Sequence, residues 1–161
     1  QQLSQDGDVV ACANYNSPGQ IVIAGHLKAV ESALVALKEA GAKRSVLLPV
    51  SVPSHCALMQ PAAEALRLKL DSITLKLPAI PVLHNVDAQT RDSADAIKIA
   101  LIEQLYQPVR WVDVMQAIQK ESDQVIECGP GKVLTGLCKR ISRDIVCTPV
   151  FDLASLEKVS G

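Results

Sequence analysis

The chain has 161 residues, of which 48% are hydrophobic and 20% charged, and its formal net charge at pH 7 is -1. This composition is typical of a soluble globular protein, and the near-neutral net charge gives no indication of a nucleic-acid-binding surface, although it leaves room for a local basic patch. No apolar run reaches the ~18 residues that a membrane span needs. The five cysteines are an odd number without a Cys-x-x-Cys pair, which favours a reducing cytoplasm over a disulfide framework or a zinc site.

The first part of the chain, residues 1–50, has the pattern strand, strand, helix, strand. β-type runs occupy 9–15 and 20–24, and the Asn-Ser-Pro-Gly segment between them has turn chemistry, because Pro presets one backbone angle and Gly supplies a positive one. The two runs are predicted to form a β-hairpin or a pair of adjacent strands. Leu and Val at helical spacing predict an amphipathic helix over 27–41. A further β-type run at 45–50 predicts a third strand.

The rest of the chain, residues 51–161, alternates helices with strands. This alternation is typical of a parallel α/β sheet, so the chain is predicted to be an α/β protein. The predicted helices are 61–70, 93–106, a segment after Pro108 that carries Trp111, Met115 and Ile118, and 133–141. The predicted strands are 80–86, 124–128 and 145–151.

His55 is the first candidate for chemistry. A neutral imidazole takes up a proton near pH 7, as the general base for a hydroxyl nucleophile must. His55 lies on a Pro-Ser-His-Cys loop after a strand and before a helix, where α/β proteins commonly place functional groups. Position alone nevertheless favours a structural histidine at the start of a helix.

Other residues with chemical potential are explained more simply by structure. His26 follows a strand end, where a solvated turn histidine is expected, and His84 lies in a strand run, where a satisfied structural histidine is expected. No two histidines have the i, i+4 spacing of a helix-borne metal pair, so no metal site is predicted. The Gly-Pro-Gly-Lys turn at 129–132 lacks the first Gly and the Ser or Thr of a phosphate-binding Walker A loop. Cys56 is adjacent to His55, and neighbouring side chains rarely face each other, so core packing is its expected role.

Four segments carry a more specific signal when they are taken together. They are Asn-Tyr-Asn-Ser-Pro-Gly-Gln-Ile-Val-Ile-Ala-Gly at 14–25, Pro-Val-Ser-Val-Pro-Ser-His-Cys-Ala-Leu-Met at 49–59, Gln-Leu-Tyr-Gln-Pro-Val-Arg-Trp at 104–111, and Glu-Cys-Gly-Pro-Gly-Lys-Val-Leu-Thr-Gly at 127–136. In this order and approximate spacing, they resemble the C-terminal half of the bacterial malonyl-CoA:acyl-carrier-protein transacylases. The resemblance covers nearly the whole chain.

This resemblance implies both a fold and a reaction. Residues 1–50 would be part of a ferredoxin-like small subdomain, and residues 51–161 the C-terminal part of an α/β-hydrolase-like parallel-sheet subdomain. The reaction would be a ping-pong transfer in fatty-acid biosynthesis: a serine takes malonyl from malonyl-CoA and passes it to the phosphopantetheine thiol of acyl carrier protein. No cofactor is implied beyond the coenzyme A thioester and the phosphopantetheine that the partner carries.

The resemblance also assigns residues. His55 matches the catalytic base, and Gln104 the position whose main-chain carbonyl orients that base in place of an aspartate. The other residues placed near substrate or partner are Asn14, Asn16, Gln20 and Ser54 in the cleft, and Lys43, Arg44, Lys139 and Arg140 toward coenzyme A phosphates or an acidic carrier protein. The four basic residues fit ordinary solvated surface charge equally well.

Three parts of the family's active site are absent from the sequence: the Gly-x-Ser-x-Gly turn, the Pro-Gly-Gln-Gly segment of the oxyanion hole, and the arginine for the malonyl carboxylate. We expect them in an N-terminal half of the same protein, which would be a partner of this chain. This chain alone is then expected to be inactive and to fold poorly. Two alternatives stay open: a non-catalytic module that docks a carrier protein, and an α/β domain in which His55 is only a loop residue.

Overall fold

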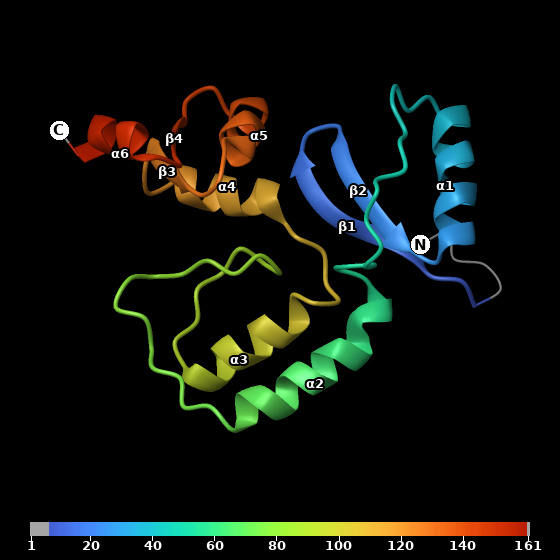
Figure 1. Cartoon of the computed structure of the whole chain (residues 1–161), viewed down its shortest axis with the longest axis horizontal. Helices are drawn as coiled ribbons and strands as arrows, with labels where there is room; N and C mark the ends of the chain where they lie inside the picture. Colours follow the sequence, from blue (N-terminus) through green and yellow to red (C-terminus); the bar gives the residue numbers. More distant parts are fainter. Residues whose placement is uncertain (1–6, 161) are drawn as a thin grey trace.

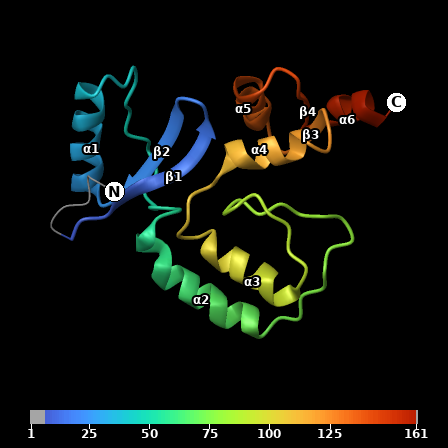
Figure 2. The same cartoon turned by 180° about the vertical axis from the view of Figure 1, so that it is seen from behind.

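The computed structural model describes residues 7–160, so the first six residues of the predicted small subdomain lie outside it. Its helices and strands fall into three groups (Figure 1). A hairpin with one helix forms the first group, a pair of helices the second, and the C-terminal strands and helices the third. The view from behind shows the same three groups (Figure 2). The predicted α/β class is confirmed.

The first group contains the predicted hairpin. β1 (Val10–Ser17) and β2 (Gln20–Gly25) pair antiparallel. Gly19, at φ +77, supplies the positive angle that the turn requires. α1 (Leu27–Glu39) follows directly and packs its apolar face on the strands. The residues buried in this cluster are Val10, Ala29, Val30 and Ala33.

The predicted strands at 45–50 and 80–86 are wrong. Neither segment forms a strand in the structure, and neither makes a ladder with another described segment. A β-type run is stabilised by cross-strand pairs rather than by its own propensity, so the pattern has no effect where a neighbouring strand is lacking. Apolar side chains in both segments are therefore exposed, including Val46, Leu48 and Val82.

The second group is a pair of helices, α2 (Gln60–Asp71) and α3 (Ala94–Glu103). A single 3₁₀ turn, η1 (Ala57–Met59), leads into α2, and Pro61 lies in the first turn of α2 as predicted. The N-terminus of α3 is capped by Ser93, whose Oγ accepts a hydrogen bond from the Ala96 N–H at 3.2 Å. α3 ends directly before the residues that contact His55.

Val109 connects the hairpin to the C-terminal group. Its N–H donates to the Ala13 carbonyl at 2.8 Å, and its own carbonyl accepts from the Tyr15 N–H at 2.9 Å. Because these bonds hold Val109 extended beside β1, α4 (Trp111–Gln119) begins three residues after Pro108 rather than at it. These hydrogen bonds also bring the segment that follows α3 close to the hairpin.

The third group contains a parallel strand pair, as the alternation of elements predicts. β3 (Gln124–Cys128) and β4 (Val146–Val150) run side by side, with α5 (Val133–Ile141) as the crossover between them. The buried centre of this group consists of Met115, Cys138 and Ile145.

One helix, α6 (Leu153–Ser160), is not predicted by the sequence pattern. The residue before it, Asp152, accepts a hydrogen bond from the Ser155 N–H at 2.7 Å through its carboxylate. That is the geometry of a helix N-cap, and an Asp before an apolar run was the available signal. No helix in the described part of the chain is both long and apolar enough to cross a membrane.

Candidate active site around His55

His55 lies on the loop that precedes η1, and two consecutive carbonyls hold it. Its φ of +63 puts the backbone in the left-handed region. The His55 N–H donates to the Leu105 carbonyl at 2.9 Å, and the ring nitrogen Nδ1 lies 2.6 Å from the Gln104 carbonyl oxygen. Both acceptors directly follow α3. The end of this helix therefore orients the backbone and the ring of His55 together.

These contacts define which ring nitrogen is basic. A carbonyl oxygen can only accept, so Nδ1 carries a proton, and in the neutral ring the lone pair is on Nε2. A neutral imidazole in this tautomer can take a proton from a hydroxyl or thiol at Nε2. The carbonyl fixes the tautomer without placing a full negative charge beside the ring, which an aspartate would do. The structure thus brings the two predicted residues together across 49 positions of sequence.

The predicted cleft residues Asn14, Asn16 and Gln20 lie on the hairpin, the first two on β1 and the third at the start of β2. Gln20 contacts a second predicted residue, because its Oε1 accepts a hydrogen bond from the Arg140 guanidinium of α5. Ser54 is half-buried directly before His55. The hairpin and α5, far apart in sequence, therefore lie next to each other.

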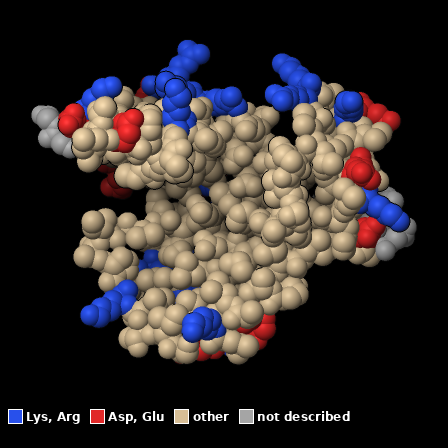
Figure 3. Space-filling model, viewed as in Figure 1, with Lys and Arg blue, Asp and Glu red and all other residues tan. Residues whose placement is uncertain are grey.

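The four predicted basic residues are exposed and lie in two separate segments. Lys43 and Arg44 follow α1, and Lys139 and Arg140 lie in the last turn of α5. Figure 3 shows Lys and Arg side chains along the upper edge of the molecule, over α5 and over the segment after α1. Positive charge on one edge suits phosphate groups or an acidic partner.

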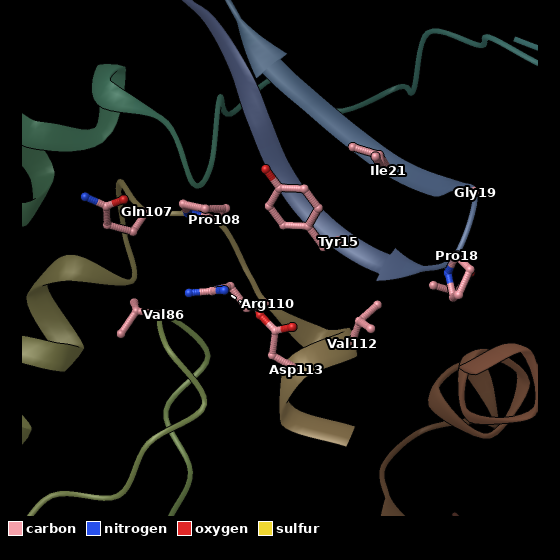
Figure 4. A pocket seen from close by; sticks show the side chains of 11 residues that line it. Tyr15, Pro18, Gly19, Ile21, Val86, Gln107, Pro108, Arg110, Val112 and Asp113 are labelled. Carbon is pink, nitrogen blue, oxygen red and sulfur yellow. Dashed lines mark hydrogen bonds and ion pairs between the residues drawn. The ribbon is translucent and has the colours of Figure 1, made fainter. Parts of the chain in front are cut away.

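A separate pocket of about 570 Å³ opens between the hairpin turn and the first turn of α4 (Figure 4). Tyr15 and Arg110 line it, and the Arg110 Nε donates to an Asp113 carboxylate oxygen at 2.6 Å. His55 is not among the lining residues. The sequence did not single out these side chains, although both lie inside segments that carry the resemblance.

The residues expected to be structural are placed accordingly. His84 is 8% exposed, and burial, together with the charge of Arg91, lowers its pKa. The His26 ring accepts a hydrogen bond from the Val9 N–H at 2.9 Å. Cys56 is 1% exposed, which confirms that it packs in the interior. Among residues 7–160 no group of three or more His, Cys, Asp or Glu is placed to hold a metal ion.

A buried carboxylate, Glu127, was missed by sequence reasoning. It is 8% exposed at the end of β3. Its two oxygens accept hydrogen bonds from the Leu134 N–H at 2.8 Å, the Thr135 N–H at 2.7 Å and the Thr135 hydroxyl at 2.6 Å. Glu127 thus caps the N-terminus of α5 from outside the helix. Only the fold, which returns α5 over β3, brings these groups together.

Comparison with known proteins identifies the family. The model of the acyl transferase domain family matches residues 1–153, and the chain belongs to that family. The chain is 50% identical to the malonyl CoA-acyl carrier protein transacylase of Haemophilus influenzae over 157 residues, which are 97% of this chain and 50% of the relative. It is 54% identical to the protein of that name from Escherichia coli over 137 residues, covering 84% of this chain and 44% of the relative.

Solved structures give the same result. An acyl carrier protein S-malonyltransferase from Vibrio cholerae superimposes with a TM-score of 0.92 at 53% identity, covering 96% of this chain and 51% of that one. A malonyl-transacylase in complex with a type II PKS acyl-carrier protein superimposes with a TM-score of 0.93 at 51% identity, covering 95% and 50%. The chain thus spans about half the length of the relatives it matches.

Proposed function

We propose that this chain is part of an enzyme that transfers malonyl from malonyl-CoA to acyl carrier protein in fatty-acid biosynthesis, an [acyl-carrier-protein] S-malonyltransferase. The names of its relatives support the reaction. The observation that carries the proposal is the 2.6 Å contact between the His55 ring and the Gln104 carbonyl, which suits a general base. The serine nucleophile would come from a segment outside these 161 residues.

In the first half-reaction, His55 Nε2 takes the proton of the serine hydroxyl while the serine oxygen attacks the thioester carbonyl of malonyl-CoA. The C–S bond then breaks, and the imidazolium returns its proton to the coenzyme A thiolate. The second half-reaction runs the same steps in reverse with a new thiol. His55 deprotonates the phosphopantetheine thiol, the thiol attacks the malonyl ester, and the serine oxygen regains the proton.

The fold would divide this work between two parts. We propose that residues 1–50 belong to a ferredoxin-like small subdomain and residues 51–161 to an α/β-hydrolase-like subdomain, with the substrate between them. Asn14, Asn16 and Gln20 would then line the cleft from the hairpin side, and Ser54 from the His55 side. The cytoplasm remains the predicted location.

The function is tested by combining the chain with a serine-bearing N-terminal segment from a relative and supplying malonyl-CoA and holo acyl carrier protein. We expect malonyl-carrier protein to form and coenzyme A to be released, whereas this chain alone forms neither. If the combined protein binds carrier protein but transfers no malonyl, the proposed enzymatic function is wrong and the docking module is supported.

Replacing Gln104 by alanine tests the role of its main chain. The carbonyl that accepts from His55 remains in Gln104→Ala, so we expect the rate of malonyl transfer to fall less than about tenfold, far less than on loss of the base itself. Steady-state kinetics with both substrates measure this. A loss as large as that of a His55 variant would show that the Gln104 side chain acts directly.

Reversing the charge of Arg140 tests the basic edge. Arg140→Glu removes the bond to Gln20 and opposes an acidic carrier protein, so we expect KM for the carrier protein to rise about tenfold, with a smaller effect at high salt. Lys69→Glu, an exposed charge reversal on α2, is the matched control and should leave KM unchanged. If both variants raise KM equally, the change in net charge is the cause and the position of Arg140 is not.

A further inference from the structure

The backbone at His55 is strained. Among the described residues other than glycine, only His55 and Ala88 have a positive φ. A side chain in the left-handed region is sterically disfavoured, so the surroundings must hold the residue there. Without that support the loop would relax, and the ring would move away from the Gln104 carbonyl.

One side of the support is the turn directly after α3, where the carbonyls of Gln104 and Leu105 accept from the ring and the backbone of His55. These two bonds fix His55 relative to the helix. They do not fix the shape of the loop on either side of His55, because both act on a single residue.

The other side of the support is Cys56. Its S–H donates to the Pro53 carbonyl at 3.2 Å and so closes a turn that spans His55. The Cys56 carbonyl in turn accepts from the Met59 N–H at 2.9 Å, which starts η1. Cys56 is 1% exposed, so water does not reach its thiol. A substitution that removes the S–H takes this hydrogen-bond donor away from the Pro53 carbonyl.

We infer that the Cys56 thiol is a positioning group for His55: through its bond to Pro53 it keeps the loop in the left-handed conformation that aims the ring at Gln104. Cys56 is not itself catalytic, because the bond to Pro53 engages its thiol and burial keeps the side chain from solvent. The inference rests on the proposed function for its kinetic consequence. Its structural consequence, the orientation of the imidazole, is independent of that function.

Two substitutions distinguish a hydrogen-bond donor from a side chain that only packs, because the two explanations predict opposite orders of kcat for the two variants. Cys56→Ser keeps a donor to Pro53, whereas Cys56→Val fills the space and cannot donate. If the thiol positions His55, the Ser variant stays close to wild type and the Val variant loses kcat by roughly ten- to a hundredfold, since small misplacements of a catalytic group have effects of this size. If Cys56 only packs, the Val variant is the better enzyme and the buried hydroxyl of the Ser variant is harmful.

Cys138→Ala and Cys56→Ala form a matched pair. Cys138 is fully buried in a different cluster, beside Met115, and burial together with the neighbouring Cys147 thiol raises the pKa of Cys138 to about 12. Both Ala variants remove a buried thiol and should lower Tm. Only Cys56→Ala should also lower kcat and move the pH profile of kcat.

The experiment uses the complete transferase with its serine-bearing segment, and adds ¹⁵N NMR of the histidine ring. We expect the Nδ1 proton that bonds to Gln104 to be retained in wild type and Cys56→Ser and lost in Cys56→Val. If Cys56→Val has the kcat of the wild type and retains the Nδ1 proton signal of the ring, the inference is wrong. An inactive wild type would overturn the proposed function, and the NMR comparison would still decide the role of Cys56.

Discussion

Replacing His55 by alanine is expected to lower the rate of malonyl transfer by roughly 10⁴-fold or more. The variant has no group that can take the serine proton at neutral pH, and the hydrogen bond from the ring to the Gln104 carbonyl is lost. His55→Asn is the better-folded companion variant, because Asn tolerates a positive φ more readily than Ala and most other residues with a side chain. Both should be measured for kcat and KM with malonyl-CoA and with carrier protein.

The matched control for this prediction is His26→Ala. His26 is half-buried like His55, but it lies in the turn before α1 and accepts its hydrogen bond from Val9. We expect a modest loss of stability and no large change in kcat. A loss below tenfold in both His55 variants, with folding intact, would reject His55 as the base and support the reading of a loop histidine.

The sequence predicted the local elements of the site better than its geometry. The helical spacing of Leu and Val in α1, the Pro-Gly turn of the hairpin and Pro61 at the start of α2 are local signals, and each is found where it was predicted. The strand runs at 45–50 and 80–86 failed for one physical reason. A strand depends on a partner, and no periodicity within the run shows whether a partner is present.

The pairing of His55 with Gln104 was outside the reach of pattern reasoning. Position alone favoured a structural histidine, and only the resemblance of four segments to a transacylase reversed that reading. The structure adds what the resemblance did not provide, namely the second carbonyl at Leu105 and the left-handed backbone of His55. The side chains of Tyr15 and Arg110 show the same limit, because they meet at a pocket only after Val109 joins the hairpin to the start of α4.

Removing the carboxylate of Glu127 is expected to destabilise the fold around α5. Glu127→Ala leaves two N–H groups at the start of α5 and the Thr135 hydroxyl without their acceptor. Lost caps and buried unsatisfied donors together amount to about 2–4 kcal/mol in the free energy of unfolding. Because α5 carries Lys139 and Arg140, we also expect weaker binding of the carrier protein.

Chemical denaturation of the complete protein at neutral pH measures this loss. Glu31→Ala, an exposed glutamate replaced within α1, is the matched control and should change the free energy of unfolding very little. A loss in Glu127→Ala no larger than that of the control would mean that water replaces the carboxylate at the helix N-terminus.

The pH dependence gives a second and independent test of Glu127. Burial by itself would raise the pKa of this carboxyl, but the hydrogen bonds from Thr135 and from the Leu134 N–H outweigh burial, so the pKa is lowered from its usual value. The unfolded chain therefore binds the proton more readily than the folded one. The stabilisation from Glu127 is present above the unfolded pKa of about 4.3, and it is lost as the pH falls through the lowered folded pKa.

Glu127→Gln keeps an acceptor oxygen for α5 but cannot titrate. We expect it to be less stable than wild type at pH 7, because the negative charge at the helix N-terminus is gone, and to approach wild type as the pH falls below about 4. The free energy of unfolding of both proteins, followed from pH 7 to pH 3, should therefore converge. Curves that stay parallel over this range would show that folding does not lower the pKa of Glu127.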